Sequence, residues 1–122
     1  EAAMYAPHHK VDNLIAFIDV NGQQIDGPTE KIMNNRDLQL KYEAFGWKVL
    51  HVDGNDMAGL QSCLANAKQM LGNGIPMMIL MKTEMGAGVD FMMGSHKWHG
   101  VAPNDQQLEE ALNQLSETLG DY

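Results

Sequence analysis

The chain has 122 residues, of which 44% are hydrophobic and 20% charged, and this composition is typical of one globular domain. Its formal net charge of −8 at pH 7 argues against nucleic acid and anionic membranes as partners, because a basic surface for phosphates is lacking. No apolar run approaches the roughly 20 residues of a membrane span, and no signal-peptide pattern opens the chain.

The first predicted element is the end of a helix over residues 1–9, where the alanines favour a helix and Pro7 disfavours one. His8 and His9 are interpreted as solvated helix-end residues. Because the chain begins at Glu1 without an initiator methionine, we expect it to have been cut out of a longer polypeptide.

The next element is a strand over residues 14–20, whose apolar run Leu14-Ile-Ala-Phe-Ile18 is typical of a strand buried on both faces. A polar loop follows at once and continues through Glu30. Its oxygen-bearing side chains are Asp19, Asn21, Gln23, Gln24 and Asp26. Ligands of open α/β sheets bind beyond the carboxyl ends of strands, and such oxygens suit Mg²⁺. Asn-Gly and Asp-Gly are also common in ordinary turns, so this loop has two interpretations.

A second helix is expected to be capped by Asn35 and to end at Gly46. Its inward side is predicted to carry Leu38, Tyr42 and Phe45. A short strand over residues 47–52 comes next.

The helix after it carries an apolar series and is expected to stop at Gly72. The series is Leu60, Cys63, Leu64, Ala67, Met70 and Leu71. Cys63 is the only cysteine, which excludes an internal disulfide and fits a reducing compartment such as the cytoplasm. Its place in the series favours a buried helix-face residue over a catalytic thiol.

A third apolar strand is predicted over residues 76–81, with its methionines as core residues. The loop of residues 83–103 is rich in glycine and histidine, and a loop of that length is often functional. His96 and His99 are three residues apart, so they could share a metal ion or be surface histidines.

The last predicted helix opens with a capping box formed by Asn104 and Gln107 and ends at Gly120. Its apolar stripe is Leu108, Ala111, Leu112, Leu115 and Leu119. Strands alternating with helices predict an α/β fold with a parallel sheet and flanking helices. The two special loops follow the first and third strands, so both are expected at one edge of the sheet.

Four segments together resemble the thiamine diphosphate-binding domain of transketolase. They are residues 14–27, 42–47, 82–88 and 96–103. The resemblance covers residues 2–119 in the right order and is closest to the short N-terminal subunit of split bacterial transketolases. It implies a thiamine diphosphate-binding fold, with residues 1–122 as a partial domain equivalent to its C-terminal half.

The resemblance also implies a role for individual residues. Asn21 would ligate Mg²⁺ through its side-chain oxygen, and Gln23 would ligate it through its backbone carbonyl. Ile25 would pack against the rings of thiamine diphosphate.

Met85 and Gly86 match the loop that lines the cofactor. His99 matches a histidine that reaches both the diphosphate and the reacting carbonyl, and it is the expected catalytic residue.

Two departures bear on completeness. The family's Gly-Asp-Gly sequence, whose aspartate is a metal ligand, is expected upstream of Glu1. Its catalytic glutamate is expected in a separate domain. A third, minor departure is Val20, which stands where many relatives carry a polar residue and does not bear on completeness. The resemblance therefore implies that this chain alone is inactive.

The implied function is that of a transketolase fragment, a transferase that passes a two-carbon ketol unit from a ketose phosphate to an aldose phosphate. The implied setting is the pentose phosphate pathway in the cytoplasm. The expected partners are sugar phosphates, the remaining transketolase domains or subunit, and a second copy in a homo-oligomer.

The alternative functions are those of a deoxyxylulose-phosphate synthase, a 2-oxoacid dehydrogenase component or a non-catalytic α/β binding domain. The segment His99-Gly-Val-Ala-Pro103 favours transketolase.

Overall fold

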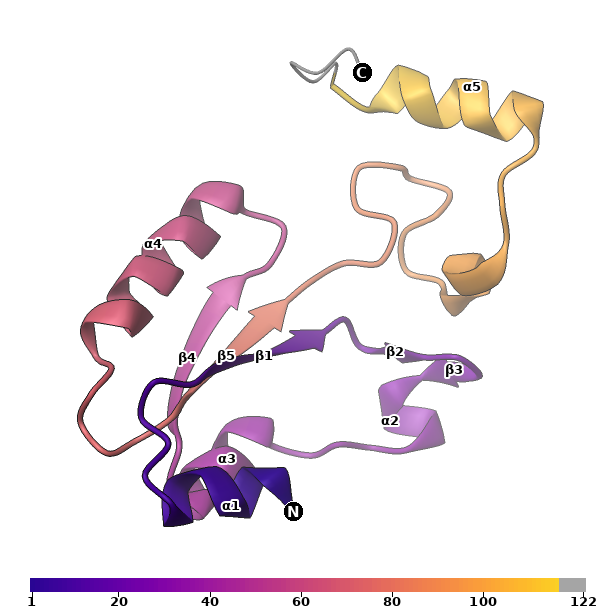
Figure 1. Ribbon diagram of the computed structural model, residues 1–122. Helices are drawn as coiled ribbons and strands as arrows, with labels where there is room; N and C mark the ends of the chain where they lie inside the picture. The colour runs from indigo at the N-terminus through magenta and orange to yellow at the C-terminus, as the bar shows by residue number, and fades with distance from the viewer. Residues whose placement is uncertain (117–122) are drawn as a thin grey trace. The chain divides into compact units, whose positions relative to one another are not determined.

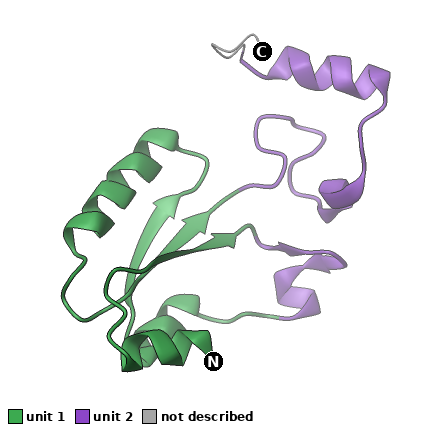
Figure 2. Ribbon diagram, in the orientation of Figure 1, with its two compact units in different colours: residues 1–21, 34–83 green, residues 22–33, 84–122 purple. Residues whose placement is uncertain are grey.

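A computed structural model describes residues 1–116, and the chain forms two compact units (Figure 2). Unit 1 comprises Glu1–Asn21 and Asn34–Thr83. Unit 2 comprises Gly22–Met33 and Glu84–Tyr122. Within residues 1–116, no helix combines the length and apolar character that a membrane crossing requires.

Unit 1 is built on a parallel sheet of three strands in the order β1-β5-β4 (Figure 1). The strands are β1 (Ile15–Val20), β4 (Lys48–Asp53) and β5 (Met77–Lys82). Each bound lies within one residue of its prediction. The α/β class and the parallel sheet are therefore confirmed.

The register of the sheet brings the three carboxyl ends to the same edge. Val20 of β1 and Asp53 of β4 both pair with Lys82 of the central strand β5. The ends of the first and third strands in the sequence thus lie at one edge of the sheet, as predicted, and the two strands are also neighbours.

Helices cover both faces of this sheet (Figure 1). Helices α1 (Ala2–His8) and α3 (Leu38–Phe45) pack on one face, and α4 (Met57–Gln69) packs on the other. The first core consists of Ala6, Trp47, Val49, Met78 and Leu80, and the second of Ala67, Met77 and Ile79. Met77 and Met78 are 1% and 3% exposed, so their interpretation as core residues is confirmed, whereas Met81 is only partly buried against the second core.

Pro7 lies inside α1, and the cost of this position is offset by a tertiary contact. A proline has no N–H, so it leaves the carbonyl four residues earlier without its helical partner. Here that carbonyl belongs to Ala3, and the indole N–H of Trp47 donates to it at 2.7 Å. The helix therefore persists through the proline. His8 and His9 are exposed at its end, as expected.

The start of α3 was wrongly predicted. Asp37, not Asn35, is the cap, and its carboxylate accepts a hydrogen bond from the Leu40 N–H at 2.9 Å. Asn35 lies two residues too early for this geometry, and its backbone carbonyl accepts from the ammonium of Lys41 at 2.7 Å.

The end of α3 is confirmed at Gly46, which adopts the left-handed conformation. Leu38 and Tyr42 pack against the first core, but Phe45 is 43% exposed. The prediction that Phe45 faces inward is wrong, because Trp47 takes the core position and packs edge-on against Tyr42 at 5.7 Å.

Helix α4 is capped by Asp56, whose carboxylate accepts from the Ala58 N–H, and it ends at Gln69, before the predicted Gly72. Cys63 is half-buried and packs against the core around Ala67. Burial raises the pKa of its thiol, which lowers the fraction of reactive thiolate. This supports the structural role of Cys63.

Unit 2 contains structure where only a polar loop was predicted. A hairpin of β2 (Gln23–Gln24) and β3 (Gly27–Pro28) leads into α2 (Thr29–Ile32). The 3₁₀ helix η1 (His96–Gly100) interrupts the long loop that follows β5.

Helix α5 (Asp105–Gln114) has the predicted capping box between Asn104 and Gln107. Among the described members of the predicted apolar stripe, Ala111 is buried and three leucines are exposed, namely Leu108, Leu112 and Leu115. The predicted Leu119 and Gly120 lie outside the described residues.

Candidate functional site

The carboxyl edge of the sheet in unit 1 is joined by a small network of hydrogen bonds. The Gly54 N–H, which follows β4, donates to the Lys82 carbonyl at 2.7 Å. The Thr83 N–H, which follows β5, donates to the Val20 carbonyl at 3.5 Å, and its hydroxyl donates to a carboxylate oxygen of Asp19. This network fixes the ends of all three strands at the edge where α/β proteins bind ligands.

Asn21, the predicted metal ligand, is the residue directly after β1 and closes the first segment of unit 1. It therefore continues a strand whose end the network anchors. Its side chain is half-buried.

Gln23 and Ile25 belong to the hairpin of unit 2. Gln23 begins β2 and pairs with Pro28, while Ile25 and Asp26 form the two-residue turn. Ile25 is 74% exposed, so its apolar side chain is available to an apolar ring. Thr29 holds the hairpin closed, since its N–H donates to the Gly22 carbonyl at 2.9 Å.

The glycine-rich loop after β5 folds into successive tight turns. The Ala87 N–H donates to the Glu84 carbonyl at 3.2 Å, and the Val89 N–H donates to the Gly86 carbonyl at 3.0 Å. The Gly94 N–H donates to the Glu84 carboxylate at 2.8 Å, which closes the loop at its base. Met85 and Gly86, the predicted cofactor-lining residues, lie within this closed segment.

Gly86 has a φ of +72° and lies directly against Met92. A Cβ at this position would lie 2.6 Å from the Met92 Cβ and 2.8 Å from its carbonyl carbon. Both the conformation and the close approach therefore require glycine here.

Gly86→Ala is expected to destabilise the loop more than Gly94→Ala. Gly94 has a similar φ of +68° but no atom within 4 Å of an added Cβ, so its variant measures conformational strain alone. That strain costs about 1–2 kcal/mol, and the overlap with Met92 adds about 1–3 kcal/mol. Hydrogen exchange of the Val89 and Gly94 amides measures the free energy of loop opening. Equal effects of the two variants would contradict the steric requirement at Gly86.

His99 lies on η1, and a neighbouring residue holds this element in place. The indole N–H of Trp98 donates to the Phe91 carbonyl at 3.0 Å, and the two rings meet edge-on at 5.4 Å. His99 is exposed, and within residues 1–116 its ring has no hydrogen-bond partner. The imidazole is therefore presented on a fixed turn and does not itself fix the turn.

Hydrogen bonds also join the glycine-rich loop to α5, and no sequence pattern indicated them. The Asp90 N–H donates to the Gln114 side-chain oxygen, and the Gln114 side-chain amide donates to the Asp90 carboxylate, both at 2.8 Å. Leu115 contacts Gly88, where an added Cβ would lie 2.9 Å from its Cδ2. These contacts join residues 24 or more positions apart, which is beyond the reach of any periodic pattern.

The donor chemistry of the predicted residues fits the implied ligands. The amide oxygen of Asn21 and the carbonyl oxygen of Gln23 are hard, neutral donors of the kind that Mg²⁺ accepts. The described residues hold no group of three or more histidine, cysteine or acidic side chains that could bind a metal ion. Mg²⁺ commonly keeps few protein ligands and takes others from phosphate oxygens. Within the described chain, His96 and His99 thus belong to no such metal-binding group.

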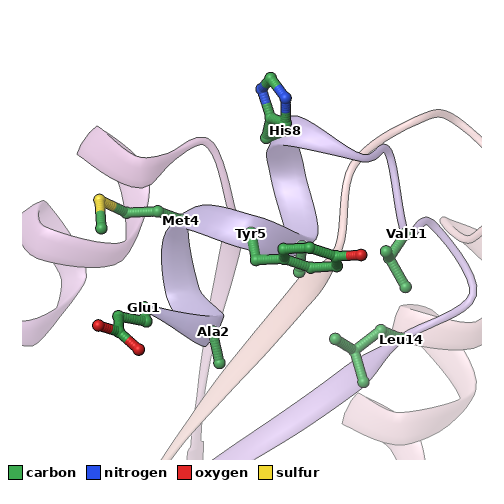
Figure 3. A pocket seen from close by; sticks show the side chains of 8 residues that line it. Glu1, Ala2, Met4, Tyr5, His8, Val11 and Leu14 are labelled. Atoms are coloured by element: carbon green, nitrogen blue, oxygen red, sulfur yellow. The ribbon is translucent and has the colours of Figure 1, made fainter.

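A shallow groove of about 850 Å³ beside α1 is the other hollow of interest (Figure 3). Its lining is almost entirely apolar and includes Met4, Tyr5, Val11 and Leu14. The carboxylate of Glu1 adds negative charge. An almost entirely apolar lining with a carboxylate suits a diphosphate poorly, so this groove is not a candidate for the cofactor site.

Residues 1–119 match the protein family described as transketolase, thiamine diphosphate binding domain. The chain is 37% identical over 119 residues to one subunit of the apulose-4-phosphate transketolase of Phocaeicola vulgatus, covering 98% of this chain and 42% of that protein. It is 44% identical over 103 residues to transketolase 1 of Saccharomyces cerevisiae, covering 83% of this chain and 15% of that protein.

Solved structures agree with these sequence matches. A crystal structure of transketolase from Campylobacter jejuni superposes with a TM-score of 0.82 at 31% identity, covering 93% of this chain and 17% of that one. The chain therefore spans less than half the length of these relatives.

Proposed function

The chain belongs to the family of transketolase thiamine diphosphate-binding domains, and from this membership we propose that it supplies part of the cofactor site of a transketolase. The observation that carries the proposal is the sheet edge of unit 1, where Asn21 directly follows β1 and the glycine-rich loop begins directly after the neighbouring β5. Two segments that the family uses for its cofactor thus start from adjacent strand ends.

The proposed roles follow the chemistry of each group. Asn21 and Gln23 would hold Mg²⁺ through oxygen atoms, and the exposed side chain of Ile25 would pack against the cofactor's rings. Bound thiamine diphosphate would supply the carbanion chemistry of the ketol transfer. Met85 and Gly86 would line the cofactor.

His99 would donate a hydrogen bond to the diphosphate and to the oxygen of the reacting carbonyl. An imidazole ring can also act as a general acid or base, which suits a group at that position. The exposure of its ring and the fixation of η1 by Trp98 support this role.

Further components are part of the proposal. Several relatives are named as single subunits of a transketolase, and such names imply a companion subunit. We use "complete protein" for the longer polypeptide that contains this chain, or for this chain together with its companion. Sugar phosphates in the pentose phosphate pathway of the cytoplasm are the proposed substrates and setting.

Self-association of the complete protein is also proposed. The exposed leucines of α5 and the exposed Phe17 of the edge strand β1 are apolar surface that association would bury.

A two-carbon transfer assay tests the proposed function. The complete protein, with thiamine diphosphate and Mg²⁺, is expected to shorten a ketose phosphate by two carbons and lengthen an aldose phosphate by two, as measured by mass spectrometry of the sugars. The isolated chain is expected to be inactive. Consumption of a 2-oxo acid with release of CO₂ instead would favour the other thiamine enzymes. Absence of any reaction or metal dependence would favour a non-catalytic binding domain.

A further inference from the structure

The junction between β1 and β5 contains two polar side chains to which the family resemblance gives no role. Asp19 is the fifth residue of β1, and Thr83 is the first residue after β5. Both belong to unit 1, and the Thr83 hydroxyl donates a hydrogen bond to the Asp19 carboxylate.

This side-chain bond reinforces a weak place in the backbone ladder. The last backbone bond between the two strands, from the Thr83 N–H to the Val20 carbonyl, is 3.5 Å long. That length lies outside the usual 2.7–3.2 Å of an N–H···O bond, so the backbone alone holds the strand ends loosely. The Asp19–Thr83 bond adds a second tie between the two strand ends, and its acceptor is a carboxylate.

Thr83 is also fixed from its other side by the end of β4. An added Cβ on Gly54 would overlap the Thr83 Cγ2, so the threonine methyl lies directly over the glycine backbone. The Gly54 N–H donates to the Lys82 carbonyl at 2.7 Å. The hydroxyl of Thr83 is thereby directed by a packed methyl group and not by its own rotation alone.

The register explains why this tie bears on the site. Ile15 pairs with Met77 and each following residue pairs in step, so one further step places Asn21 level with Thr83. Asn21 is two positions beyond Asp19 and directly follows the last residue of the strand. A constraint on Asp19 and Thr83 therefore constrains the backbone from which the Asn21 side chain projects.

We propose that Asp19 and Thr83 are positioning residues for the magnesium and thiamine diphosphate site. Their hydrogen bond holds the backbone before Asn21 against Thr83, the first residue of the loop after β5. This inference rests on the proposed function. Asp19 acts through its bond to Thr83 and is not a metal ligand. Gly54 is required because a larger residue would displace the Thr83 side chain.

The test uses the complete protein and compares four variants by calorimetric titration with thiamine diphosphate at fixed Mg²⁺. Thr83→Val keeps the packed methyl but removes the donor, and it is expected to raise Kd on the order of tenfold, the lower range for a group that orients a metal ligand. Thr83→Ser restores the hydroxyl and is expected to restore most of the affinity. Asp19→Ala with Thr83→Val is expected to be little worse than Thr83→Val alone.

Ser62→Ala is the matched control, because it also removes one hydroxyl hydrogen bond, from Ser62 to the Ala58 carbonyl on the exposed side of α4. It is expected to leave Kd unchanged. The substrate KM at saturating cofactor is expected to stay the same in every variant.

Three results would overturn the inference. They are an unchanged Kd in Thr83→Val, a loss that Thr83→Ser does not restore, and a double variant that binds much more weakly than Thr83→Val alone. Failure of the proposed function has a different signature, because the unsubstituted complete protein would then bind no thiamine diphosphate, and the inference would fall with it.

Discussion

Replacing His99 with alanine in the complete protein is expected to lower kcat by on the order of 100-fold or more at saturating cofactor. That is the size of effect expected when a positioned general acid or base is lost. The structure supports this over a packing role, because His99 is exposed and Trp98 anchors the turn through its bond to the Phe91 carbonyl. Thermal stability is therefore expected to change little.

His96→Ala is the matched control for this variant. It removes the same side chain from the same 3₁₀ helix, three residues earlier. It is expected to keep most of the turnover. If His99→Ala kept more than about a third of kcat, the loss would fall well short of a general acid-base contribution and the catalytic role would be refuted. Equal losses in both variants would show that the turn, and not the imidazole of His99, is what activity needs.

Asn21→Ala is expected to weaken Mg²⁺-dependent binding of thiamine diphosphate by about tenfold or more. The substitution removes a neutral oxygen ligand from a cation that demands near-octahedral geometry. The effect should fall on the affinity for cofactor, with the substrate KM unchanged at saturating cofactor. The measurement is the activity of the complete protein as a function of cofactor and Mg²⁺ concentration.

Asn73→Ala provides the comparison, because Asn73 lies before β5 at the opposite end of that strand and its side-chain amide donates to the Met70 carbonyl at 3.0 Å. It removes the same kind of side chain at the opposite edge of the sheet from Asn21. An Asn21 variant with the same cofactor dependence as the Asn73 variant would show that Asn21 is only a turn residue.

The prediction that β1 is buried on both faces is wrong, because none of its residues is fully buried and Phe17 is 46% exposed. The sheet could still be predicted from the sequence, because β1 and β5 are short apolar runs that favour burial. β5 shows this most clearly, since Met77, Met78 and Ile79 are almost fully buried between two helical layers. The capping box of α5 was predictable for a similar reason, because Asn104 and Gln107 satisfy each other's backbone donors locally.

The errors arose in two situations. In one, the deciding contact is distant in sequence. In the other, two suitable cap residues lie close together in the sequence. Asn35 and Asp37 are both good caps by residue type, and only the position of the first helical residue separates them. The exposed stripe of α5 has the periodicity of a buried face, so periodicity alone could not distinguish burial in this chain from a surface left for a partner.

In the candidate site, too, local features could be predicted from the sequence and long-range contacts could not. Asn21, Met85, Gly86 and His99 were found from local motifs that resemble a known family. The contacts that hold their segments were not, because Asp19 and Thr83 are 64 residues apart and Asp90 and Gln114 are 24 apart. The Asp19–Thr83 pair follows from the strand order β1-β5-β4, and the Asp90–Gln114 pair follows from the packing of the loop against α5. No local pattern specifies either arrangement.

We propose that this chain carries part, and only part, of a thiamine diphosphate site. Calorimetric titration with thiamine diphosphate, with and without Mg²⁺, tests this directly on the isolated chain and on the complete protein. We expect Mg²⁺-dependent binding by the complete protein and weak or undetectable binding by the chain alone. Micromolar or tighter binding to the isolated chain, or no binding to the complete protein, would contradict it.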